Sequence, residues 1–170
     1  MNFRQIKTIF TCFVRRHKFI NTSCNFNEND IIYIYKLKFD EKEEKFMAEI
    51  VYTKNAPDAI GPYSQAVKTG TLVFTSGQIA INPASGNVEA ATIEEQTEQV
   101  CKNLTAVLEE AGSSIDKVIK TVCFLADMND FAKFNEVYGK YFTSKPARSC
   151  VAVKTLPKNV LVEVEAIAEA

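Results

Sequence analysis

The chain has 170 residues, of which 46% are hydrophobic and 24% are charged, as is typical of a single globular domain without a membrane-spanning run. The net charge of −1 hides an asymmetry: residues 1–46 hold nine basic and six acidic side chains, whereas residues 47–170 hold eleven basic and fifteen acidic ones. An acidic domain is a poor match for the phosphate backbone of nucleic acids, which calls for a basic face.

The cysteines are five in number, widely spaced, and include no C-x-x-C pair. This pattern argues against a disulfide framework and against a zinc site, and it favours a reducing compartment such as the cytoplasm. We therefore expect no metal. The five positions are Cys12, Cys24, Cys101, Cys123 and Cys150.

The N-terminal segment, residues 1–46, differs in character from the rest. Residues 1–27 contain five basic side chains and no acidic one, which resembles an organelle transit peptide. If residues 1–46 are such a peptide, the protein belongs in a mitochondrion or plastid. The other interpretation is a disordered extension, or upstream sequence that was wrongly assigned to the gene. In the latter case, translation starts at Met47. We expect one compact domain over residues 47–170.

The first half of that domain predicts three strands and a helix. Glu49–Thr53, Gln65–Lys68 and Leu72–Thr75 have strand character, and the last two flank a glycine turn. A helix begins after Thr92, a good N-cap, and ends at Gly112. Its apolar face is formed by Ile93, Val100, Leu104, Val107, Leu108 and Ala111.

The second half predicts a strand, a helix and two further strands. Val118–Ala126 is rich in β-branched and aromatic residues, and a second amphipathic helix, opened near Asp127 or Asn129, follows it. Ser149–Lys154 and Val160–Ala168 complete the order βββ-α-β-α-ββ. This order predicts an α+β fold, with both helices packed on one face of a sheet.

The strand Val118–Ala126 predicts a partner subunit. Both of its alternating sets are largely apolar: Val122, Phe124 and Ala126 on one face, and Thr121, Cys123 and Leu125 on the other. One layer of helices covers only one face of a sheet, so a second copy of the chain is expected to cover the other.

Several catalytic classes are excluded by composition. The only histidine is His17, in the N-terminal segment, which excludes Ser-His-Asp and Cys-His catalysis in the domain. Neither a phosphate-binding G-x-x-x-x-G-K-[ST] loop nor a G-x-G-x-x-G dinucleotide motif occurs.

Arg148 is the strongest candidate that remains. It is the only arginine in residues 47–170, at the entrance to a strand. A guanidinium matches a carboxylate with a rigid fork of donors that lysine cannot copy. The alternative is a surface salt bridge.

Other candidates each leave an alternative open. Glu163 and Glu165 share a mixed strand face, and form a partly buried acid pair, a partner for Arg148, or an exposed edge. Cys150 is either a nucleophile or, more simply, core filler. Tyr63 either covers a ligand or packs locally.

Backbone and amide groups add two further candidates. Ser76-Gly77 follows a strand, and its glycine lets backbone N–H groups approach a ligand. Asn135 interrupts the apolar face of the second helix and is expected to bond inward.

At these residues the chain resembles the reactive intermediate deaminase family, RidA/YjgF. The resemblance covers residues 47–170 and none of 1–46. It rests on several motifs in the family's order: Asn55-Ala56-Pro57, Ile60-Gly61-Pro62-Tyr63-Ser64-Gln65-Ala66, Thr75-Ser76-Gly77-Gln78-Ile79, Phe131-Ala132-Lys133-Phe134-Asn135, Pro146-Ala147-Arg148-Ser149-Cys150-Val151 and Glu163-Val164-Glu165-Ala166-Ile167-Ala168.

The resemblance implies a chorismate-mutase-like α+β fold with a mixed, mostly antiparallel sheet. It further implies a homotrimer whose three sheets form a central barrel, with a site in each subunit cleft. The implied reaction is the cofactor-free hydrolysis of 2-imino acids and their enamines, released by pyridoxal-phosphate enzymes, to 2-oxo acids and ammonia. A non-catalytic 2-oxo-acid-binding or regulatory role on the same fold is the alternative, and RNA cleavage is a third.

The resemblance also implies roles for the candidates. Arg148 would pair with the substrate carboxylate, and Tyr63 and Asn135 would line the pocket. Ser76 and the backbone of Gly77 would form its wall. Finally, Glu163 and the backbone carbonyl of Cys150 would position the attacking water.

One stretch departs from the family pattern. Phe142–Pro146 looks shorter than the usual approach to the arginine, and Lys145 stands where an aromatic residue is common. We expect substrate range or subunit contacts to differ there.

Overall fold

A computed structural model describes residues 48–170. The predictions for residues 1–46, and the predicted domain boundary at Met47, lie outside the described residues. Within the described part, no helix has the length and apolar character needed to cross a membrane.

The predicted order of elements is confirmed, with one addition. A strand of two residues, β4, follows β3 and was not predicted. The strands and helices are β1 (Glu49–Val51), β2 (Ala66–Thr69), β3 (Leu72–Thr75), β4 (Gln78–Ile79), α3 (Ile93–Glu110), β5 (Val118–Leu125), α4 (Phe131–Tyr141), β6 (Ala147–Ala152) and β7 (Val162–Glu169).

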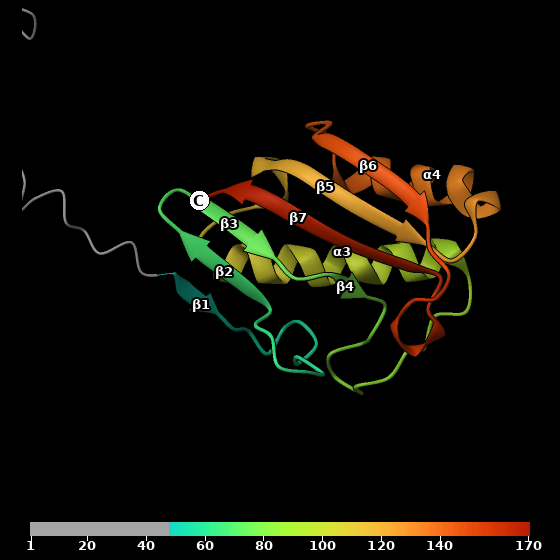
Figure 1. Cartoon of the computed structure of the whole chain (residues 1–170), viewed down its shortest axis with the longest axis horizontal. Helices are drawn as coiled ribbons and strands as arrows, with labels where there is room; N and C mark the ends of the chain where they lie inside the picture. The colour runs from blue at the N-terminus through green and yellow to red at the C-terminus, as the bar shows by residue number, and fades with distance from the viewer. Residues whose placement is uncertain (1–47) are drawn as a thin grey trace, which may run out of the picture. The chain divides into compact units, whose positions relative to one another are not determined.

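The strands form one mixed sheet in the order β1-β2-β3-β7-β5-β6, with β4 also paired to β7 (Figure 1). All pairings are antiparallel except that of β5 with β6. Parallel neighbours need a crossover connection, and α4 supplies it. The crossover places the start of β6 beside α4, which matters for Arg148.

The helix α3 begins and ends as the sequence predicts. The Thr92 hydroxyl accepts the Glu95 amide (3.3 Å) while the Glu95 carboxylate accepts the Thr92 amide (3.1 Å), a complete capping box. After the helix, Gly112 adopts a φ of 77°, a conformation that glycine reaches without steric cost.

The helix α4 begins slightly later than predicted. Asp127 caps a short 3₁₀ turn (Met128–Asp130), where its carboxylate accepts the Asn129 amide at 2.9 Å. The α-helix then runs from Phe131, and Phe134 and Tyr138 on its inner face are buried.

The two helices lie on the same side of the sheet (Figure 1). The face beneath them is closed: the inward residues of β5 and β7 are at most 2% exposed, and they are Thr121, Cys123, Leu125, Val162, Val164, Ala166 and Ala168. The prediction of an α+β fold with both helices on one face is therefore confirmed.

The opposite face of the sheet is open in the single subunit, and it carries exposed apolar side chains beside the charged Lys120, Glu163 and Glu165. Phe74 is 40% exposed and Val151 is 49% exposed, while Val122 and Phe124 are half-buried between them. Ala126 lies beyond the end of β5 and is exposed. The cover for this face, predicted to be a second copy, stays a prediction.

The added strand β4 is held by a buried side chain of α3. The Asn103 amide donates to the carbonyls of Ile79 (3.0 Å) and Ile81 (2.9 Å), and Gln99 donates to its oxygen (2.9 Å). Because Ile79 pairs with Glu163 on β7, this contact fixes the chain beside a candidate residue.

We predict that Asn103→Ala lowers the free energy of unfolding by about 1–3 kcal/mol, because two buried carbonyls lose their donor. Urea unfolding measures the change. The matched control is Lys102→Ala, one residue earlier on the exposed side of α3, where the loss should stay below about 0.5 kcal/mol. Equal losses in the two variants would contradict the role given to Asn103.

Candidate functional site

Arg148 is the second residue of β6 and projects onto the helix-covered face. Its Nη1 donates to the Asn135 side-chain oxygen on α4 at 2.8 Å. The guanidinium carbon lies 4.7 Å from the centre of the Tyr138 ring and 5.5 Å from that of Phe131. These distances suit cation–π contacts, which help to hold a partly buried cation. The structure thus brings together two of the predicted residues, Arg148 and Asn135.

The guanidinium of Arg148 has no carboxylate partner among residues 48–170. The ion pairs found there are Lys102–Glu98 and Lys133–Glu94, both on the surface. The surface salt bridge considered as the alternative for Arg148 is therefore absent from the described part of the chain. An arginine whose fork is engaged by one neutral amide and aromatic rings retains donors for an anion.

A cavity of about 510 Å³ opens beside Arg148. This volume is in the range of sites that take small molecules. The lining comes from α4, from the turn that follows it and from β6: Asn135, Tyr138, Gly139, Phe142, Thr143, Lys145, Pro146 and Arg148.

Glu163, Gly77 and Ser76 form a second cluster. A Cβ atom at Gly77 would collide with the Glu163 carboxylate and lie 2.8 Å from its carboxyl carbon. The Glu163 side chain therefore occupies the space that a side chain at Gly77 would fill. Ser76 donates its hydroxyl to the Ser64 carbonyl at 2.6 Å, which ties this cluster to the loop before β2.

The loop that carries Tyr63 is fixed by the buried amide of Gln65. That amide accepts the Thr53 N–H at 2.7 Å and donates to the carbonyls of Thr53 (3.0 Å) and Pro57 (2.8 Å). Tyr63 itself is 47% exposed, and its hydroxyl accepts the Ile60 N–H at 3.2 Å. An exposed ring on an ordered loop is available to a ligand or to a neighbouring chain.

The two clusters lie on opposite faces of the sheet. Arg148 pairs with Thr121, which is buried beneath α4, whereas Glu163 pairs with Phe124 on the open face. Residues paired across strands project to the same face, and neighbours along a strand alternate. One subunit therefore does not bring Arg148 and Glu163 to a common point.

Cys150 shares the helix-covered face with Arg148 and pairs with Cys123. Burial raises the pKa of the Cys150 thiol, and the nearby Arg148 offsets part of that effect. A thiol with a raised pKa is a weak nucleophile, which favours the core-filler interpretation.

The backbone of Cys150 faces away from β5. The Val153 N–H donates to the Leu125 carbonyl, so Val153, and by alternation Val151 and Ser149, direct their backbone groups toward β5. Cys150, in the other set, directs its carbonyl to the free edge of the sheet. That carbonyl is consequently available to a water molecule or a ligand.

The Glu163 carboxylate is half-buried, and its pKa is raised, first by burial and second by the like charge of Glu165. A carboxylate with a raised pKa is a stronger base than an exposed one and can accept a proton from water. The predicted acid pair of Glu163 and Glu165 is therefore partly buried. As for metals, no group of three potential ligands occurs within residues 48–170.

Six of the eight residues that line the cavity were not among the predicted site residues. Two of these six are Tyr138, which contacts Arg148, and Lys145, which carries a positive charge. Tyr138 was assigned to the apolar face of α4, although it stands three residues after Asn135 and hence on the same side of the helix. Lys145 was noted only as a departure from a family pattern. Its place in the cavity depends on the turn between α4 and β6.

Comparison with known proteins gives a consistent result. The model of the family described as Endoribonuclease L-PSP matches residues 53–170. A RutC family protein of Pyrococcus horikoshii is 55% identical over 123 residues, which cover 72% of this chain and 98% of that protein.

Two solved structures from E. coli agree with these matches. TdcF with bound serine is 44% identical, with a TM-score of 0.69 over 72% of this chain and 98% of its own. The YjgF gene product is 45% identical, also with a TM-score of 0.69, over 71% and 98%.

We predict that Gly77→Ala displaces the Glu163 carboxylate, because the new methyl group needs the same space. Once displaced toward solvent, Glu163 should titrate at a lower pH, nearer the pKa of an exposed carboxyl group. Carbon-13 NMR of the labelled carboxyl group measures this pKa. Gly139→Ala is the matched control, because a Cβ there meets nothing within 4 Å. An unchanged Glu163 titration in Gly77→Ala would contradict the prediction.

Proposed function

The chain belongs to the Endoribonuclease L-PSP family, which includes the RutC and YjgF (Rid) proteins, and we propose that it hydrolyses 2-imino acids and their enamines to 2-oxo acids and ammonia. The predicted family and the chorismate-mutase-like fold are confirmed. 2-Iminobutanoate and 2-iminopropanoate are the proposed substrates. The observation that carries the proposal is the Arg148 guanidinium, which faces a cavity of suitable size without a carboxylate partner in the described residues.

The first proposed role is the recognition of the negatively charged substrate carboxylate. Arg148, oriented by Asn135, binds the substrate carboxylate through its fork of donors. Binding there fixes the adjacent imine carbon, and orientation of the reactants can contribute several kcal/mol to lowering the barrier. Tyr63, Ser76 and the Gly77 backbone complete the wall.

The proposed hydrolysis proceeds by addition of water to the C=N bond. Glu163 accepts a proton as the water oxygen bonds to the imine carbon, and that proton passes to nitrogen. The hydroxyl proton then passes to nitrogen as the carbon–nitrogen bond breaks, so ammonia leaves and the carbonyl of the 2-oxo acid forms. The oxidation state of the substrate does not change, so the reaction consumes no redox cofactor. The edge carbonyl of Cys150 would help to hold the water.

A complete site of this kind requires more than one subunit. Arg148 and Glu163 lie on opposite faces of the sheet in one copy, and the open face that carries Glu163 also exposes the apolar side chains of Phe74 and Val151. We therefore propose a homotrimer in which the open faces pack together and a neighbouring copy brings Glu163 to each Arg148 cavity. The exposed apolar side chains of the open face and the separation of the two clusters both support this arrangement.

A second candidate function is binding without turnover. The E. coli relative TdcF holds serine, an amino acid, in its solved structure, and a binding protein for small carboxylates would use the same arginine. Binding of 2-oxobutanoate without any acceleration of imine hydrolysis would favour this function. RNA cleavage, which the family description names, fits less well, because residues 47–170 carry fifteen acidic and eleven basic side chains.

We predict that Arg148→Ala lowers kcat/KM for 2-iminobutanoate roughly a hundredfold, since a charge-assisted pair worth about 3 kcal/mol is lost. The assay follows ammonia release when a threonine dehydratase supplies the imine. Arg148→Lys should fall in between, because it keeps the charge but loses the fork. Lys154→Ala, a loss of charge on an exposed residue outside the cavity, is the control. Equal rates in Arg148→Ala and the parent would remove the basis of the proposal.

We predict that the pH dependence of kcat/KM reports the ionisation of Glu163. Its pKa is raised, so the ionised form and the rate are fully present at high pH and are lost as the pH falls through that pKa. Glu165→Gln removes the like charge and should move this acid limb of kcat/KM to lower pH, with rates measured at excess dehydratase. A limb at the same pH in Glu165→Gln would show that another group controls it.

A further inference from the structure

Lys145 provides a second cation in the Arg148 cavity. It lies in the turn between α4 and β6, where its N–H donates to the Phe142 carbonyl at 3.1 Å. Its φ of 55° is unusual for a residue other than glycine, so the surrounding turn must hold it there. The backbone of Lys145 is therefore fixed by the turn, while its exposed side chain remains able to change rotamer.

Among residues 48–170, no acidic side chain lines this cavity. The lining does contact the acidic residue Asp116, whose carboxylate accepts the hydroxyl of Thr143 at 3.4 Å. Within residues 48–170, neither Lys145 nor Arg148 has a carboxylate within 4.0 Å. The cavity thus combines two cations with neutral polar and aromatic groups.

The two cations are close enough to bind one small molecule. They are three positions apart along the chain, so their Cα atoms are at most about 11 Å apart, and both side chains are long. A substrate with one carboxylate uses only one of the two cations, whereas a diacid satisfies both.

From these observations we infer that the cavity favours 2-imino acids with a second acidic group, the imines of acidic amino acids. Arg148 binds the carboxylate next to the imine carbon, and Lys145 binds the carboxylate of the substrate side chain. Lys145 acts here as a specificity residue. The inference rests on the proposed function for the reaction, whereas the binding of a diacid by two cations does not depend on that function. Since Lys145 is exposed, its contribution should be about five- to tenfold in affinity.

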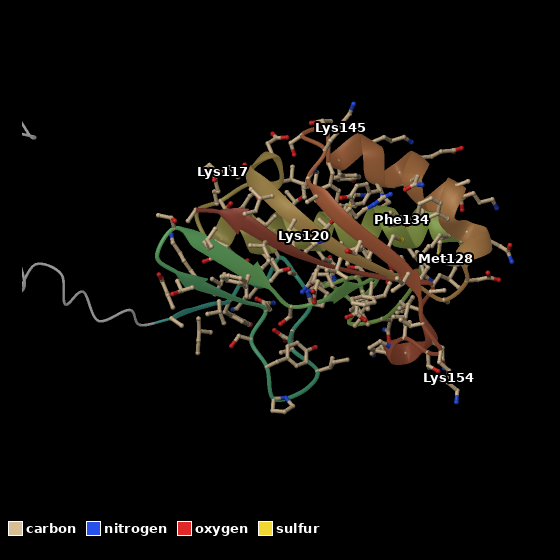
Figure 2. All side chains as sticks on the ribbon, turned by 45° about the horizontal axis from the view of Figure 1, so that its top comes forward. Lys117, Lys120, Met128, Phe134, Lys145 and Lys154 are labelled. Atoms are coloured by element: carbon tan, nitrogen blue, oxygen red, sulfur yellow. The ribbon has the colours of Figure 1, made fainter. Side chains whose placement is uncertain are left out.

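The test compares two imines. A D-aspartate oxidase supplies 2-iminosuccinate and a threonine dehydratase supplies 2-iminobutanoate, and kcat/KM is measured for each. Lys145→Met should lower the ratio of the two values, diacid over monoacid, about five- to tenfold, and Lys145→Glu should lower it further. Lys154→Met is the matched control, because Lys145 and Lys154 flank β6 at its two ends (Figure 2) and the second lies outside the cavity.

The outcomes separate the two proposals. An unchanged ratio in Lys145→Met, or an equal fall in Lys154→Met, overturns the role of Lys145. If the parent accelerates neither hydrolysis, the proposed function fails, and calorimetric binding of 2-oxoglutarate and 2-oxobutanoate decides the inference. Selective weakening of 2-oxoglutarate binding by Lys145→Met then supports a diacid site, and equal weakening of both ligands overturns it.

Discussion

The helices α3 and α4 cover one face of the sheet, and within residues 48–170 the other face is left uncovered. Every feature of the candidate site follows from this arrangement and from the alternation of side chains along a strand. Residues that project beneath the helices meet α4, as Arg148 meets Asn135 and Tyr138. Residues that project to the other side, such as Glu163, lie on the uncovered face.

The environment of Arg148 balances two opposing costs. Moving a guanidinium out of water is unfavourable, and a carboxylate partner would offset that cost but would also occupy the fork. The structure uses an amide oxygen and aromatic rings instead. These neutral groups stabilise the cation while its net charge stays uncompensated, so an incoming carboxylate meets a positive potential and an oriented donor.

Much of the fold could be predicted from the sequence because its signals are local. The ends of α3 follow from Thr92 and Gly112, and the apolar face of that helix follows from spacing. The strand β4 could not be predicted, since two residues carry no periodicity and the strand exists through the contacts of Asn103 and β7. The separation of Arg148 from Glu163 depends on the strand order β7-β5-β6, which no local pattern specifies. The position of Lys145 at the cavity could not be predicted for a similar reason, because the turn that carries it is short and irregular.

The close approach of Gly77 and Glu163 has a consequence for protein engineering. The two positions share a single volume, in which glycine provides the space and glutamate fills it. A larger residue at 77 is compatible only with a shorter or differently directed residue at 163, so substitutions at the two positions are not independent. A library that varies Glu163 alone would sample one half of a coupled pair. Varying both positions together is the rational way to move the carboxylate without creating a void or a clash in the strand pair beneath it.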